Sequence, residues 1–159
     1  MGKANDSVFE AAKNAYALYG WLLQDVAKEV GWDRAIAIHA GGGDRIAGML
    51  GGMVRAKCRQ QTPDAASVAE VLEDAYRGFG MDYEVEATNG SVKNRIKRCP
   101  IYDGLAASGI DHATIQQLCQ GMAGREYDHL KGLVPELTGR VKFRENASDT
   151  CLEEFVLAR

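Results

Sequence analysis

The sequence predicts an α+β domain in which N-terminal helices pack on an antiparallel sheet, in the order ααα-ββ-αα-ββ. Apolar residues recur at three- and four-residue spacing through most of the first half, which is typical of amphipathic helices. After Gly80 the period changes to two, and Asn89-Gly90 separates two alternating runs. This dipeptide is the strongest short-range signal of a β-hairpin. We therefore expect a single domain over residues 1–159, with a helical first half at 6–79 and a sheet-containing second half at 81–157.

Three helical regions fill the first half. A glycine triplet interrupts the second region, and Asp44 can cap a new helix after it. Within that region Gly48, Gly51 and Gly52 let a second helix or a ligand approach the backbone closely. The regions run from Asp6 to about Val30, from Asp33 to Arg59, and from just after Asp64 to about Gly78–Gly80.

The hairpin turn predicts the pairing of its two strands, because loop length sets the register. The bases of the run 93–98 then face acids across the hairpin, so the run is one side of a charge ladder. Arg98 has no acidic partner in this register and is available for a ligand. The expected charge pairs are Glu86–Lys93, Glu84–Arg95 and Asp82–Lys97, and the expected core pairs are Ala87–Val92 and Tyr83–Ile96.

The second half continues with two helices and a second hairpin. A short helix begins at Pro100, and a longer one runs from Asp111 to about Leu133. The strand-like runs that close the chain are Arg140–Glu145 and Thr150–Leu157.

Composition excludes several classes of function. The formal net charge is −3 and the basic run is matched by acids, so we expect no nucleic-acid binding. No apolar run approaches the roughly 20 residues that cross a bilayer, and MGKANDSVFE is unlike a signal peptide, so we expect a cytoplasmic protein that does not bind membranes. The four cysteines form no CxxC pair, and therefore no zinc signature or disulfide framework.

Cys99 stands directly before Pro100, which places it at the N-cap of the short helix. A thiolate there gains from the helix dipole and from nearby bases, conditions that lower a cysteine pKa and create a nucleophile or a metal ligand. The alternative is a small buried hydrophobic residue at a tight corner. Asp103 lies one helical turn further on, either orienting a substrate amine or merely solvated.

The long helix carries a second group of candidates. His112, Cys119 and Glu126 share one stripe, but neighbours in it are about 10 Å apart along the axis, too far to bind one metal together. Glu126 and His129 form one E-x-x-H motif, whose side chains share a face. Di-iron bundles need two such motifs, so the motif alone predicts no metal centre.

Cys151 opens the last strand and shares a face with Glu153 and Phe155. If this face points inward, Glu153 is a buried carboxylate with a raised pKa, as a general acid or base requires. The other interpretation pairs Glu153 with a lysine at the sheet edge, and it is favoured because acidic residues are seldom fully buried.

Several of these positions resemble the L-2-amino-thiazoline-4-carboxylic acid hydrolase family, with a layout related to vinyl-reductase-like small-molecule-binding domains. The matching residues lie between about 76 and 157: Arg98-Cys99-Pro100, Leu105, Cys119, and Cys151 with Phe155. The resemblance implies hydrolysis of a C–N bond in a small cyclic amidine that carries a carboxylate. For this chemistry we expect Cys99, Asp103, Cys119 and Cys151 to be catalytic, with an activated cysteine or a bound water as the attacking group. We expect Arg98, Glu126 and His129 to bind the substrate.

A different class of function uses the same residues. A non-catalytic sensor domain could hold a small ligand, haem or a metal, the metal through Cys99, Cys119 and Cys151. A structural partner subunit without chemistry is a third alternative. The sequence requires no cofactor, predicts a small-molecule ligand or substrate as the partner, and leaves a homo-oligomer open.

Overall fold

The computed structural model describes residues 6–59 and 62–158, which form an α+β fold as predicted. Within these ranges there are six helices and one four-stranded antiparallel sheet. The elements are α1 (Asp6–Val30), α2 (Trp32–Ala40), α3 (Gly42–Lys57), α4 (Ala65–Gly78), β1 (Asp82–Ala87), β2 (Ser91–Arg98), α5 (Pro100–Ala107), α6 (His112–Leu133), β3 (Leu137–Lys142) and β4 (Cys151–Leu157).

Four helices, rather than three, precede the first hairpin. The expected second region is divided at Gly41, which ends α2 and is the N-cap of α3. Asp44 therefore lies in the first turn of α3 and is not its cap. A carboxylate in that turn still interacts favourably with the helix dipole.

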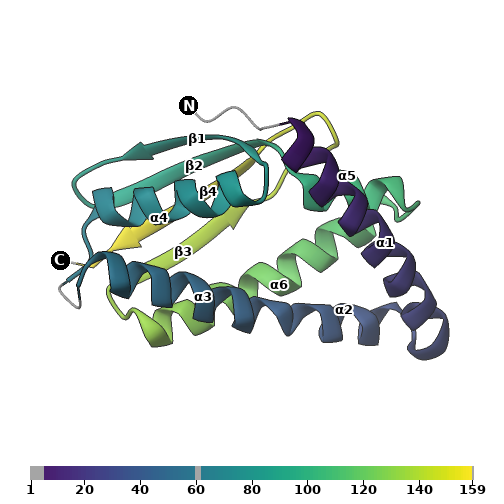
Figure 1. Cartoon of the computed structure of the whole chain (residues 1–159). Helices are drawn as coiled ribbons and strands as arrows, with labels where there is room; N and C mark the ends of the chain where they lie inside the picture. Colours follow the sequence, from purple (N-terminus) through teal and green to yellow (C-terminus); the bar gives the residue numbers. More distant parts are fainter. Residues whose placement is uncertain (1–5, 60–61, 159) are drawn as a thin grey trace.

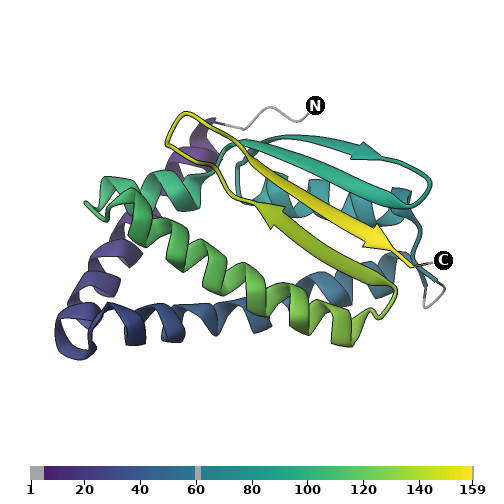
Figure 2. The same cartoon turned by 180° about the vertical axis from the view of Figure 1, so that it is seen from behind.

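The helices cover one face of the sheet. In Figure 1, α4 lies across that face, with α3 and α6 below it and the α1–α5 pair beyond the end of the strands. Figure 2, seen from behind, shows the opposite face, which no helix of the described residues covers. No helix among residues 6–59 and 62–158 is long and apolar enough to cross a membrane.

The sheet has the strand order β1-β2-β4-β3, so the two hairpins meet along β2 and β4. The Glu86–Lys93 and Glu84–Arg95 registers are confirmed, as are the registers of Ala87–Val92 and Tyr83–Ile96. Ala87 is exposed, however, so its pair is not in the core. The Asp82–Lys97 pairing is wrong, because an irregularity after Asp82 places that residue opposite Arg98. Lys97 instead reaches the Glu84 carboxylate, with Nζ 2.6 Å from Oε1.

The second hairpin begins earlier than the sequence pattern suggests. Strand β3 spans 137–142 instead of 140–145, because Leu137 is buried and pairs with Leu157 at the far end of β4. Strand β4 matches its expected range to within one residue at its start. The segment 143–150 is consequently a loop that joins the two strands.

Glycines allow α3 and α6 to pack closely. A Cβ at Gly43 would lie 2.2 Å from the Met122 carbonyl oxygen, and one at Gly51 would lie 3.2 Å from Leu133. Gly48 and Gly52 would meet nothing within 4 Å. Close approach therefore uses Gly51 of the three glycines expected for it, together with Gly43 of the triplet.

Two hydrophobic clusters form the interior. The larger joins the covered face of the sheet to α3, α4 and α6, and includes Val68 and Phe155. The smaller joins α1, α5 and α6, and includes Leu23 and Leu105. Cys99 packs against both clusters, so the joint between β2 and α5 lies where the two parts of the core meet.

Candidate functional site

A cavity of about 150 Å³, partly open to the surface, lies between the covered face of the sheet and the helices. Cys99 at the start of α5, Cys119 in α6 and Cys151 at the start of β4 all line it. The sequence left open whether these three cysteines meet, and the structure brings them to one cavity. Most of the other lining residues are apolar, including Ile46, Met49, Leu50, Leu72, Phe79, Ile96, Ile101, Ile115, Met122, Val141, Phe143 and Phe155.

Cys99 is the N-cap of α5, as predicted, with Pro100 as the first helical residue. Its electrostatics are opposite to those expected. Burial raises the pKa of the Cys99 thiol to about 11, and the backbone amides of Tyr102 and Ile101 offset only part of that rise. Of the two interpretations left open, this supports the small buried residue at a tight corner and not the activated thiolate, because Cys99 is a neutral thiol at neutral pH.

The other cavity cysteines have similarly enclosed surroundings. Burial, followed by the neighbouring Cys99 and Cys151, raises the pKa of Cys119 to about 12. Cys151 lies beside the guanidinium of Arg144. Cys58 is outside the cavity, at the C-terminal end of α3. The cavity thus presents thiols rather than thiolates at two of its three cysteines.

The E-x-x-H motif does not act as a unit. Glu126 lines the cavity, whereas His129 is exposed on the outside of α6. A three-residue step turns a helix by about 300°, so these side chains diverge by about 60°. Burial and the nearby Glu153 raise the pKa of Glu126 to about 8, which makes it largely protonated at neutral pH.

Glu153 points inward and lines the same cavity. The hydroxyl groups of Tyr76 and Tyr127 each donate a hydrogen bond to its carboxylate, and Asn94 Nδ2 donates another at 3.2 Å. Burial raises the pKa of Glu153 in spite of these three bonds. The favoured interpretation, a lysine partner at the sheet edge, is wrong, because it is Glu154 that lies near a lysine.

Arg98 does not reach the cavity, and the expectation that it lacks an acidic partner is wrong. Its Nη1 lies 3.3 Å from Asp6 and 3.9 Å from Asp82, and its Nη2 lies 4.0 Å from Glu10. Its guanidinium also stacks on Phe9, 3.8 Å from the ring centroid. The first turns of α1 supply most of these contacts, which hairpin register alone could not predict.

Asp103 is half-buried and does not line the cavity. Its charge nevertheless acts on Arg144 and Tyr102, which do line the cavity. The structure therefore gathers Cys99, Cys119, Cys151 and Glu126, and leaves Arg98, Asp103 and His129 outside the lining.

Sequence reasoning missed Arg144, which lies in the loop between β3 and β4 and lines the cavity. The side chain is 3% exposed, and its guanidinium carbon lies 4.5 Å from the centroid of the Tyr102 ring. Nη1 donates to the Ala147 carbonyl at 3.4 Å. Nε and Nη2 are buried and have no hydrogen-bond acceptor among the described residues. The alternating pattern of 140–145 gave no signal that this one residue turns inward.

No preformed metal centre is present in the described part of the chain. Among residues 6–59 and 62–158, no group of three or more His, Cys, Asp or Glu side chains is arranged to hold a metal ion. The residue types that line the cavity include thiols, but Cys99 and Cys119 would have to lose protons held with raised pKa values before they could act as ligands.

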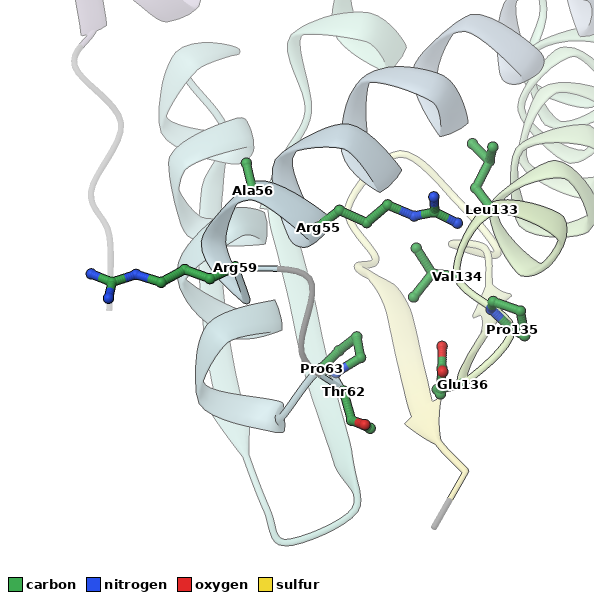
Figure 3. A pocket seen from close by; sticks show the side chains of 9 residues that line it. All are labelled: Arg55, Ala56, Arg59, Thr62, Pro63, Leu133, Val134, Pro135 and Glu136. Carbon is green, nitrogen blue, oxygen red and sulfur yellow. The ribbon is translucent and has the colours of Figure 1, made fainter.

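A second hollow lies at the C-terminal ends of α3 and α6, and Figure 3 shows it from close by. It is larger, about 850 Å³, but most of its lining residues are exposed. In Figure 3 the Arg59 side chain points away from it, while Arg55 extends toward Leu133. Ligand sites bury most of the ligand surface, so the central cavity, whose lining residues are almost all buried or half-buried, is the better candidate.

Comparison of the sequence with protein-family models and with curated proteins gave no match. The resemblance to the hydrolase family therefore stays a prediction.

Proposed function

We propose that this chain binds one compact, mainly apolar small molecule in the central cavity, as a non-catalytic ligand-binding domain. The observation that carries the proposal is the largely apolar cavity of about 150 Å³ between the sheet and the helices. Apolar cavities of about this volume in other proteins bind single aromatic rings such as benzene. A ligand the size of one ring is therefore the expected occupant.

The energetic cost of such a cavity supports a binding role. Protein interiors are close-packed, and voids larger than a water molecule are few. At about 24 cal/mol per Å³, an unfilled cavity of about 150 Å³ would cost up to roughly 4 kcal/mol, the limit for a cavity closed to water. That is a large part of the stability of a domain this size, and an apolar ligand that restores the packing contacts recovers much of it.

The polar groups of the lining favour an apolar ligand body. The Tyr76 and Tyr127 hydroxyls are already committed to Glu153. Cys99 and Cys119 are neutral thiols, which behave as small hydrophobic groups. Most of the surface that a ligand would meet is therefore apolar or internally satisfied.

The cavity can be tested by filling it. Ala123 lines the cavity, whereas Ala113 is exposed on the same helix, so Ala123→Leu and Ala113→Leu are matched variants. Toluene should raise the Tm of the wild type and of Ala113→Leu, and should have much less effect on Ala123→Leu. NMR titration with toluene should shift cavity methyl signals in the same two proteins. A wild type that binds neither toluene nor other single-ring aromatics would overturn the proposal.

Hydrolysis of a cyclic amidine is a second candidate function, favoured by one observation. Glu126 holds its proton up to about pH 8 inside the cavity, so it could protonate a departing nitrogen. Cys99, with a pKa of about 11, is poorly suited to act as the nucleophile, so the attacking group would be water.

A substrate assay tests this candidate. Wild-type protein incubated with 2-aminothiazoline-4-carboxylate should yield a product heavier by one water, detected by mass spectrometry. Glu126→Gln should abolish the reaction, whereas Asp128→Asn, at an exposed position of the same helix, should not. No turnover by the wild type would leave the non-catalytic function as the sole proposal.

Cysteine alkylation tests whether Cys99 is a nucleophile or an unreactive buried thiol. With a pKa of about 11, Cys99 should react slowly with iodoacetamide at every pH from about 5.5 to 8.5, because the thiolate is the reactive form. Peptide mapping by mass spectrometry gives the rate for each cysteine. Rapid labelling of Cys99 near pH 6 would restore it as a nucleophile.

A further inference from the structure

We propose that Arg144 makes the cavity selective for carboxylic acids, by binding the carboxylate of a small ligand whose apolar body occupies the cavity. This inference rests on the proposed function, that the cavity binds a small molecule. It gives carboxylate binding to Arg144, a residue for which the sequence predicted no role. Arg98, for which the sequence predicted this role, does not line the cavity.

The first observation is a buried cation without an acid. Arg144 is 3% exposed, and no carboxylate among the described residues lies within 4 Å of its guanidinium. Other arginines do have such partners: Arg98 pairs with Asp6, Arg125 with Asp44, and Arg140 with Glu154. Asp103 and Asp149 act on Arg144 only from beyond ion-pair distance. A buried charge is costly unless it is paired, so an anion supplied by a ligand is the natural counterpart.

The second observation is which nitrogens are unpaired. Nε and Nη2 are the two atoms without an acceptor, and they lie on one edge of the guanidinium plane. This edge presents two parallel N–H groups, the arrangement that binds both oxygens of a carboxylate at once. Nη1 already donates to Ala147, so it competes little for the ligand.

The third observation is that the guanidinium is held in place before any ligand binds. Its carbon lies 4.5 Å from the centroid of the Tyr102 ring. Tyr102 is in turn fixed by a 2.7 Å hydrogen bond between its hydroxyl and His112 Nδ1. The backbone carbonyl of Arg144 accepts a hydrogen bond from Gln116 of α6, which fastens the loop to the helix. A donor pair that is already oriented loses less entropy when it binds.

Cys151 is the alternative partner, since it lies beside the guanidinium. A cysteine sulfur is only a weak hydrogen-bond acceptor, so Arg144 retains the capacity to bind an anion beside it. If Cys151 were instead its essential counter-charge, Cys151→Ala would increase carboxylate affinity by freeing the guanidinium. Under our proposal this variant changes the affinity less than threefold.

The experiment compares benzoate with benzamide, which have the same shape and differ in charge. Each is titrated into the wild type, Arg144→Gln and the matched control Arg140→Gln, with binding followed by NMR. Charge-assisted bonds of this kind correspond to about a 10- to 100-fold difference in Kd. We expect the wild type and Arg140→Gln to bind benzoate more tightly than benzamide by that factor, and Arg144→Gln to lose the preference while still binding benzamide.

The outcomes distinguish this inference from the proposed function. If the wild type binds neither compound, nor toluene, the proposed function fails. If it binds benzamide at least as tightly as benzoate, the cavity function stands and the role of Arg144 is overturned. The ratio in the wild type is decisive even if Arg144→Gln fails to fold. A preference for benzoate that survives in well-folded Arg144→Gln, and is lost in Arg98→Gln, would return the role to Arg98.

Discussion

The two faces of the sheet differ in how their charged side chains are paired. On the open face, one row across all four strands alternates in sign, Glu86–Lys93–Glu154–Arg140. On the covered face, Glu153 faces a second acid, Glu126 of α6, whose pKa it helps to raise. Arg144, at the edge of this face, has no acid within ion-pair distance among the described residues.

The charges on the open face contribute to solubility and to strand register. The charged groups on the covered face indicate a binding site. Exposed cross-strand pairs are weak and solvated, so they need no further explanation. Buried charges with incomplete partners cost free energy, and proteins concentrate such groups at functional sites. The covered face is therefore where function is expected.

The largest effect should come from removing packing on the covered face. Phe155 is 1% exposed and its ring meets Tyr127 edge to face at 5.7 Å, whereas the next residue, Val156, is 38% exposed. We expect Phe155→Ala to lower the free energy of unfolding by about 3–5 kcal/mol. Val156→Ala should lower it by less than about 1 kcal/mol. Urea denaturation measures both, and equal losses would contradict the assignment of the two faces.

The next effect is a dependence of stability on pH that comes from Glu126. Its pKa is about 8 in the folded protein, against an ordinary value of 4.5, because of burial and the neighbouring Glu153. Between these values the folded state holds a proton that the unfolded state has lost. Stability should therefore be greatest below about pH 4.5 as far as this group is concerned, and should fall as pH rises toward 8, by at most about 1.4 kcal/mol per pH unit.

Glu126→Gln removes the titrating group and should flatten this part of the profile. Tyr76, Tyr127 and Glu153 remain around the site, so the informative quantity is the difference between the variant and the wild type at each pH. Urea unfolding at intervals from about pH 5 to 8 gives that difference. Asp128→Asn, exposed on the same helix, should leave the slope unchanged. A wild-type slope that Glu126→Gln retains would assign the titration to another group.

The sequence predicted what depends on local patterns. Asn89-Gly90 correctly indicated the Glu86–Lys93 and Glu84–Arg95 registers, and Cys99-Pro100 correctly indicated the start of α5. Both follow from turn and capping geometry within a few residues.

What the sequence could not predict depends on contacts between distant segments. The partners of Glu153 come from positions 76 and 127, and those of Arg98 from the first turns of α1. The raised pKa of Cys99 results from burial between two core clusters, whereas local capping rules consider only the helix start. Arg144 belongs to a loop whose alternating sequence resembles a strand. None of these features leaves a periodic signal.

The same contrast between packed and open surfaces recurs on α3, with a smaller expected effect. A Cβ at Gly43 would collide with the backbone of α6, whereas one at Gly48 would meet nothing within 4 Å. Gly43→Ala should destabilise the protein by about 1–3 kcal/mol through overpacking. Gly48→Ala should stabilise it by about 0.5–1 kcal/mol, because alanine is the better helix former. Thermal unfolding compares the two variants. A stabilising Gly43→Ala would contradict the close packing of α3 against the backbone of α6.

The smallest effect belongs to the open face. Glu154 receives ion pairs from Arg140 and from Lys93, whose Nζ lies 4.0 Å away. Glu154→Gln should lower the free energy of unfolding by about 0.2–1 kcal/mol, and 1 M NaCl should remove most of the difference because exposed pairs are screened. Urea unfolding with and without salt measures this. The loss from Phe155→Ala, by contrast, should persist in salt, because packing on the covered face does not depend on ionic screening. A large, salt-independent loss in Glu154→Gln would mean that the open face is covered in solution.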